Sequence, residues 1–144
     1  LSVPVYLDTS VVVAYYVPEQ NSERVQALFG EIGRPIISEL VDLEILAALA
    51  FRVRTGDLDT EYARQVENLY GEHLEAELYS LMHLQPEHYR WARDVIARFE
   101  LPLKSPDALH LAAAYVGGHR LITADRQLAR NADALNVDCE LIER

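Results

Sequence analysis

Four carboxylic acids stand at positions from which they could meet in one site: Asp8, Glu44, Asp107 and Asp125. Asp8 and Asp125 end short apolar runs, Asp107 follows a Ser-Pro pair, and Glu44 lies among apolar residues. Converging carboxylates repel one another unless a cation neutralises them. Because all the ligands are oxygens, Mg²⁺ or Mn²⁺ is favoured over Zn²⁺. The pattern therefore predicts a divalent metal site and metal-assisted hydrolysis of a phosphodiester.

Glu44 is the hardest of the four acids to explain by structure alone. An unpaired ionised carboxylate in a protein core is strongly disfavoured. The alternative is an acid at the edge of the apolar stripe, where it reaches water or pairs with an arginine. Five apolar residues share its helical face and should point to the core: Leu40, Val41, Ala47, Ala48 and Phe51.

The other three acids each have a structural alternative as well. Asp8 could cap a helix, although Thr9 and Ser10 could do the same. Asp107 would gain up to ~1 kcal/mol from the dipole at the first turn of a helix. Asp125 could also be a cap. Their role in a metal site is therefore inferred because they occur together with Glu44 at positions from which all four acids could meet.

Histidine and cysteine add little to this chemistry. His110 follows Asp107 by three residues and is either a neighbour of the site or a residue of the helix surface, and we favour the surface. The remaining histidines lack the spacing of zinc ligands. Cys139 is the only cysteine, which excludes an internal disulfide and is compatible with a reducing compartment. The expected location is cytoplasmic.

Length and composition predict one domain with one core. The chain has 144 residues, of which 50% are hydrophobic, so burial is not limiting. No apolar run approaches the roughly 18–20 residues that span a bilayer, and no signal-peptide pattern opens the chain. No membrane partner is therefore expected.

The net charge of −10 is unfavourable for a protein that binds nucleic acids broadly. The charge is uneven, however, because residues 57–77 contain seven acids and a single arginine. Basic residues lie near the acids in sequence, and Arg52, Lys104 and Arg126 are candidate contacts to substrate phosphates. The alternative is that these charges belong to ordinary solvated helix faces.

Short apolar runs alternate with helical patterns, which predicts the α/β class with a parallel sheet of about five strands and helices on both faces. Asp8 and Asp125 then fall just past strand ends, at the sheet edge where such folds bind ligands. The expected strands are 3–7, 35–38, 78–84, 120–123 and 138–142. The expected helices are 10–17, 21–29, 40–54, one from 59 or 60 with a bend near Gly71, 86–99, 105–117 capped by Ser105, and 125–135.

Four short motifs occur in order along the chain and together resemble the PIN domain, most closely the VapC-type ribonuclease toxins of toxin–antitoxin pairs. The resemblance extends from residue 5 to residue 141 as a single PIN domain. It implies that the four acids form the metal site and that the Ser10 and Thr123 hydroxyls support them. The motifs are Leu-Asp-Thr-Ser at 7–10, Ser-Glu-Leu followed by Glu at 38–44, Ser-Pro-Asp-Ala-Leu-His-Leu-Ala-Ala-Ala at 105–114, and Leu-Ile-Thr-Ala-Asp-Arg-Gln-Leu at 121–128.

The resemblance also implies a homodimer, a cognate VapB-like antitoxin whose C-terminal segment covers the groove, and cleavage of structured RNA such as tRNA or ribosomal RNA. Three alternatives remain open. A phosphatase or phospho-receiver would need a second acid next to Asp8 or two residues on, where Thr9 and Ser10 stand. The others are a non-catalytic acidic interaction module and a housekeeping nuclease of RNA processing.

Overall fold

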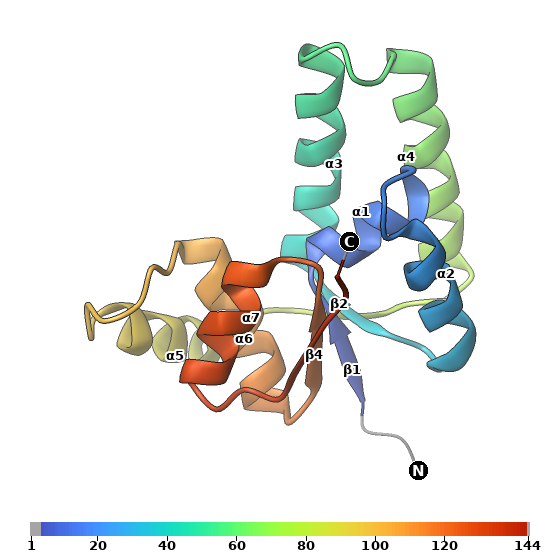
Figure 1. Ribbon diagram of the computed structural model, residues 1–144. Coiled ribbons are helices and arrows are strands. Elements are labelled where there is room, and N and C mark those ends of the chain that lie inside the picture. The colour runs from blue at the N-terminus through green and yellow to red at the C-terminus, as the bar shows by residue number, and fades with distance from the viewer. Residues whose placement is uncertain (1–3, 144) are drawn as a thin grey trace.

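A computed structural model describes residues 4–143 and contains one sheet of five parallel strands (Figure 1). The strand order is β3-β2-β1-β4-β5, with β1 at the centre. The prediction of an α/β fold with about five parallel strands is confirmed; Val3, the first residue of the predicted 3–7 strand, lies outside the described residues. The strands are β1 (Val5–Leu7), β2 (Ile36–Ser38), β3 (Ser80–Met82), β4 (Arg120–Thr123) and β5 (Cys139–Leu141).

Seven helices connect the strands of the described chain. Right-handed crossovers place α1 to α4 on one face of the sheet and α5 to α7 on the other, and Figure 1 shows α5, α6 and α7 gathered on one side of β1 and β4. The helices are α1 (Thr9–Tyr16), α2 (Ser22–Glu31), α3 (Glu39–Arg54), α4 (Thr60–Glu75), α5 (Pro86–Ile96), α6 (Ser105–Gly117) and α7 (Arg126–Ala134).

The strand order reverses between β1 and β4, and this point marks the expected binding edge. From β1 the chain moves outward to β2 and β3, then returns across the sheet to β4 and β5. Such switch points leave a crevice beyond the carboxyl ends of the two central strands. Asp8 immediately follows β1 and Asp125 follows β4 by two residues, so both lie at this edge.

The core forms where α1 packs against the central strands. Tyr6 and Leu7 of β1 and Leu121 of β4 are completely buried. The Val11–Val13 run of α1 is buried with them, so packing compensates for the low helix propensity of β-branched residues. None of the helices described here has the length and apolar character needed to cross a bilayer.

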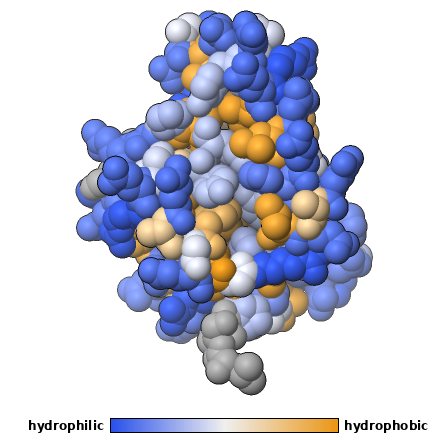
Figure 2. All heavy atoms as spheres, turned by 90° about the vertical axis from the view of Figure 1, so that its right-hand side faces the viewer, coloured by the Kyte–Doolittle hydropathy of each residue, from blue (hydrophilic) through white to orange (hydrophobic). Residues whose placement is uncertain are grey.

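Two long helices, α3 and α4, project side by side away from the sheet (Figure 1). Each has 16 residues and is therefore about 24 Å long. α4 continues through Gly71 as one helix. In the view of Figure 2 the end of this arm is mostly hydrophilic, with hydrophobic residues gathered nearer its base.

Several predicted boundaries were wrong: the helix expected at 86–99 ends at Ile96, and two others differ for reasons that are visible locally. The strand expected at 78–84 is only Ser80–Met82. The residues before it belong to the end of α4, because the backbone of Glu77 is in the left-handed region and the Leu78 amide donates a hydrogen bond to the His73 carbonyl. Lys104, not Ser105, is the N-cap residue of α6. Ser105 and Pro106 both lie in its first turn, where proline is tolerated.

Gly117, the last residue of α6, leaves room for the His119 ring. A Cβ at Gly117 would lie 2.3 Å from His119 Nε2 and 2.7 Å from its Cδ2. We expect Gly117→Ala to lower the free energy of unfolding by about 1–3 kcal/mol through overpacking, measured by urea denaturation. In a His119→Ala background the penalty should disappear, because the ring is gone. An equal penalty in both backgrounds would contradict this explanation.

Candidate functional site

Asp8 lies in the centre of the site and is 4% exposed. It caps α1: Oδ1 accepts hydrogen bonds from Ser10 Oγ at 2.7 Å and from the Val11 amide at 3.3 Å. Oδ2 accepts from Thr123 Oγ1 at 2.5 Å. Burial raises the pKa of Asp8, against the opposing effects of His110 and of these hydrogen bonds. Asp8 is therefore the N-cap of α1, and the same carboxylate contacts the Ser10 and Thr123 hydroxyls.

Ser10 and Thr123 connect the ends of β1 and β4. Ser10 Oγ accepts from the Ala124 amide at 2.9 Å, and Thr123 Oγ1 accepts from the Asp125 amide at 3.0 Å. Each hydroxyl thus donates to Asp8 and accepts from the loop that carries Asp125. This arrangement fixes the distance between two of the acids without using a charge.

Glu44 reaches the site from the second turn of α3. Its Oε1 atom accepts from Thr9 Oγ1 at 2.6 Å and from His110 Nε2 at 2.7 Å. Burial by itself would raise the pKa of Glu44, but hydrogen bonds from His110 and Thr9 outweigh it and leave the pKa lowered. Glu44 is therefore held as a carboxylate.

The surroundings of Glu44 differ from the expected core stripe. The buried residues of α3 are Val41, Ile45 and Leu49, whereas Phe51 is 56% exposed. The side chain of Glu44 is 29% exposed and lies at the edge of that stripe. The predicted stripe was shifted because the exposed face of α3 is also apolar, so hydrophobicity does not distinguish its two sides.

Asp107 and Asp125 complete the acidic group. Asp107 lies in the first turn of α6, and Asp125 caps α7 by accepting from the Gln127 and Leu128 amides at 2.8 and 3.1 Å. Burial raises the pKa of Asp107, and the negative charges of Asp125 and Glu44 raise it further. The charges of both acids therefore act on the protonation of the Asp107 carboxyl group.

Several carboxylate oxygens in this group remain free of hydrogen bonds from residues 4–143. They are Glu44 Oε2, Asp125 Oδ2 and both oxygens of Asp107, since the contacts of Glu44 and Asp125 use Oε1 and Oδ1. As the side chains stand, however, no three His, Cys, Asp or Glu residues in the described chain are grouped closely enough to hold a metal ion. Mg²⁺ commonly keeps several waters and uses one or two carboxylates directly. The donor set fits such a hydrated ion better than a closed cage.

His110 lies inside the site, and the prediction that it belongs to the helix surface was wrong. It is 4% exposed and bridges Glu44 and Tyr6, whose hydroxyl lies 2.8 Å from His110 Nδ1. α6 is buried on almost every side, because Ala108 and residues 111–114 are buried as well. That apolar composition was the sequence signal for a buried histidine. Nothing comparable in the sequence indicated the contacts of Tyr6 and Thr9.

The three candidate phosphate contacts are placed differently. Lys104 is exposed at the start of α6, and its charge opposes the rise in the pKa of Asp107. Arg126 is exposed next to Asp125. Arg52 instead pairs with Glu19 and, at 3.6 Å, with Asp57. Its guanidinium is already engaged, which weighs against a role at the site.

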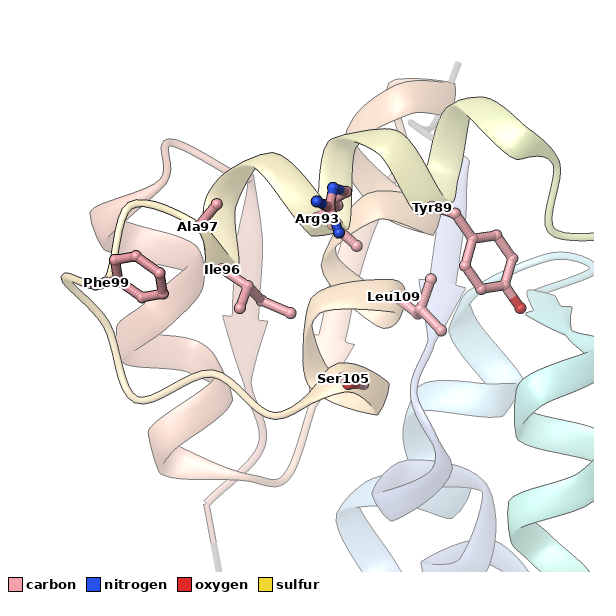
Figure 3. A pocket seen from close by; sticks show the side chains of 8 residues that line it. Tyr89, Arg93, Ile96, Ala97, Phe99, Ser105 and Leu109 are labelled. Carbon is pink, nitrogen blue, oxygen red and sulfur yellow. The ribbon is translucent and has the colours of Figure 1, made fainter.

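An apolar groove lies apart from the acidic site. A groove of about 480 Å³ runs between α5 and α6, and Figure 3 shows Tyr89, Ile96, Phe99 and Leu109 around it. No acid lines it. A well-formed apolar pocket is a common candidate for a binding site, but the four acids lie outside this one.

Several solved structures have a fold similar to that of this chain. One solved structure is FitAcB from Neisseria gonorrhoeae, with 20% sequence identity, a TM-score of 0.68, and coverage of 94% of this chain and 95% of that one. VapC20 from Mycobacterium tuberculosis, described as a toxin that cleaves the sarcin-ricin loop, has 14% identity, a TM-score of 0.67 and coverage of 88% and 94%. VapBC2 from Rickettsia felis, bound to a promoter DNA fragment, has 13% identity, a TM-score of 0.68 and coverage of 95% and 97%.

At these identities the solved structures establish similarity of fold alone. No curated protein matches the chain significantly in sequence. The family model described as PIN domain matches residues 5–134, which include all four acids. The parallel sheet, the acids at its carboxyl edge and this match lead to one conclusion: the chain belongs to the PIN domain family.

Proposed function

We propose that this chain is a metal-dependent endoribonuclease, the toxin of a toxin–antitoxin pair, in which Asp8, Glu44, Asp107 and Asp125 bind Mg²⁺ or Mn²⁺. One observation supports this most directly. The pKa of Asp107 is raised by burial and by the charges of Asp125 and Glu44, a repulsion that a bound cation would relieve. Free oxygens on these acids provide ligands for that cation.

The side chains of the chain would orient the reaction rather than take part in it covalently. A bound divalent ion supplies activation of water and neutralisation of phosphate charge. Thr9 and His110 hold Glu44 ionised, with Oε2 available. The α7 amides of Gln127 and Leu128 hold Asp125 through Oδ1, which leaves Oδ2 available. No nucleophilic side chain is required, because water attacks the phosphorus.

The proposed substrate is structured RNA such as tRNA or ribosomal RNA, and the proposed partners are a basic antitoxin and a second copy of the chain. Two observations support the substrate and the antitoxin. Among the proteins of similar fold, VapC20 is described as a sarcin-ricin loop cleaving toxin, and a structure from Klebsiella pneumoniae is described as a toxin–antitoxin complex. The acidic stretch at residues 57–77 is complementary to a basic protein.

The chemistry of the RNA ends tests the nuclease proposal. Attack by water breaks one P–O bond and adds one solvent oxygen to the phosphate, so cleavage in ¹⁸O-water with Mn²⁺ should leave labelled, linear phosphate ends. Attack by the neighbouring 2′-hydroxyl would instead leave an unlabelled 2′,3′-cyclic phosphate. Cyclic ends, or intact RNA at every metal concentration, would reject the proposal.

Expression in a bacterial host tests the toxin assignment separately. Growth should stop when the chain is expressed alone and resume when an antitoxin encoded beside it is co-expressed, and sequencing of cleaved RNA ends would identify the target. Specific cleavage without growth arrest would point instead to a nuclease of RNA processing.

A non-catalytic interaction module remains the second candidate, because the described side chains form no ready group of three ligands. Calorimetry separates it from the first. A nuclease should bind Mn²⁺ or Mg²⁺ at millimolar concentration or below, whereas an acidic docking domain should show no specific heat of binding and should capture a basic peptide instead.

Basic residues near the acids should make RNA binding dependent on salt. We expect Lys104→Ala and Arg126→Ala each to weaken RNA affinity and to reduce the slope of log K against log salt by about 0.7–1. Arg52→Ala should leave that slope unchanged and lower stability, because Glu19 loses its partner. Fluorescence anisotropy of a labelled RNA in EDTA provides the measurement. If only Arg52→Ala reduced the salt slope, then Arg52 would be the phosphate contact, and Lys104 and Arg126 would not.

A further inference from the structure

A line of buried hydrogen bonds passes through His110 and ends at Glu44. Ser38 Oγ lies 2.9 Å from the Tyr6 hydroxyl, which lies 2.8 Å from His110 Nδ1. His110 Nε2 lies 2.7 Å from Glu44 Oε1. Ser38 and Tyr6 are completely buried, and His110 nearly so. The line therefore connects the interior of the sheet to one acid of the site.

The chemistry of each group sets the direction of these bonds. An ionised carboxylate only accepts, so His110 Nε2 carries the proton and donates to Glu44. In the tautomer that carries its proton on Nε2, Nδ1 is the acceptor and the Tyr6 hydroxyl donates to it. Burial raises the pKa of Tyr6 far above its usual value, which keeps its hydroxyl protonated, and Ser38 can donate to the phenolic oxygen. Every member of the line then has a partner.

These bonds constrain which oxygen of Glu44 faces the acids. Thr9 and His110 both use Oε1, so the carboxylate is held through one oxygen, and Oε2 accepts no hydrogen bond from residues 4–143. α3 and α6 come from opposite faces of the sheet, and His110 joins them through a single ring. Without it, Thr9 alone would hold a carboxylate that can rotate.

We propose that His110, itself supported by Tyr6, is a positioning residue that presents Glu44 Oε2 to the divalent ion. The proposal rests on the proposed function, because it assigns a task within that metal site. Groups that orient metal ligands typically contribute 10–100-fold to metal affinity or activity. His110 would contribute through Glu44, without touching the ion.

Two substitutions at position 110 separate the two contacts of the ring. His110→Gln places an amide near the Nε2 position and can still donate to Glu44. His110→Asn places its amide near Nδ1, where it can meet Tyr6 but does not reach Glu44. Calorimetry with Mn²⁺ alone should show about a 10–100-fold loss of affinity for His110→Asn and most of the wild-type affinity for His110→Gln.

A second measurement uses the metal-free protein. Nitrogen-15 spectra of the His110 ring should show the proton on Nε2, with Nδ1 as an acceptor. Tyr6→Phe should perturb the Nδ1 resonance and reduce Mn²⁺ affinity by less than His110→Asn does, because the contact with Glu44 remains. A proton on Nδ1 alone would overturn the proposal, since Nε2 could not then donate to Glu44.

A variant outside the site serves as the control for a general loss of stability. Val95→Ala, in the packing between α5 and α6, should destabilise the fold without changing Mn²⁺ affinity. Equal affinities for wild type, His110→Gln and His110→Asn would overturn the role of His110 and leave the nuclease proposal standing. Absence of Mn²⁺ binding by the wild type would overturn both.

Discussion

Asp8→Asn should reduce RNA cleavage by a factor on the order of 10² to 10³, as expected when one electrostatic group of a transition state is lost, while the protein stays folded. Asp8 is the acid in closest contact with the rest of the site, through Ser10, Thr123 and the Val11 amide. The amide of asparagine has nearly the same shape but carries no charge, so attraction for a cation is lost.

The stability of this variant should move in the opposite direction. Because burial raises the pKa of Asp8 in the folded protein, the folded state holds its proton more tightly than the unfolded state. At neutral pH the ionised form therefore opposes folding in the absence of metal. We expect metal-free Asp8→Asn to melt at the same temperature as wild type or higher, measured by circular dichroism.

Asp94→Asn is the matched control, since Asp94 is exposed on α5. It should leave both cleavage and melting unchanged. Full cleavage by Asp8→Asn, in preparations shown to be free of other nucleases, would remove the basis of the proposed function. Loss of cleavage together with loss of folding would show that Asp8 acts only as a helix cap.

Metal should stabilise the protein most at neutral to alkaline pH. A ligand at 100 times its Kd contributes about 2.7 kcal/mol, and a chain of this size gains about 2–4 °C per kcal/mol. We therefore expect Mn²⁺ to raise the Tm by about 5–10 °C near pH 8 relative to EDTA. Scanning calorimetry at matched ionic strength gives the measurement.

The pH dependence follows from the directions of the pKa shifts. The pKa values of Asp8 and Asp107 are raised, so their contribution to metal-free stability is present below their unfolded pKa and is lost as pH rises through the folded value. Glu44, with a lowered pKa, behaves oppositely and loses its contribution in acid. Because protons compete with metal for all three, the increase in Tm should shrink as pH falls. An increase that does not change with pH, or that persists in an Asp8→Asn/Asp107→Asn variant, would place the metal elsewhere.

The sequence determined the sheet and the position of two acids. Runs such as 120–123, bounded by helical patterns, predict buried parallel strands, and an acid one or two residues after such a strand must lie at its carboxyl end. That is why Asp8 and Asp125 could be placed before the structure was known. Local patterns were sufficient because strand direction and crossover handedness leave little choice.

Tertiary structure decided which groups contact Glu44. His110 and Thr9 are 66 and 35 positions away from it in the chain and come from two other elements, and Tyr6 of a third element contacts His110. Helix periodicity gives the face of a residue relative to its own helix, but not the rotation of that helix against its neighbours. α3 is apolar on its exposed side as well, so the rotation that brings Glu44 beside His110 had no signature in the sequence.

The same reasoning explains Arg52. It follows Glu44 by two helical turns and was a reasonable phosphate contact by proximity in sequence. Its pairing with Glu19 depends on how the segment between α1 and α2 packs against α3, which no local pattern encodes. Residue types and spacing thus determined which acids this chain possesses and where two of them lie. Packing of helices from opposite faces of the sheet determined how those acids are held, because hydrogen bonds between distant segments form only after the core has set their relative orientation.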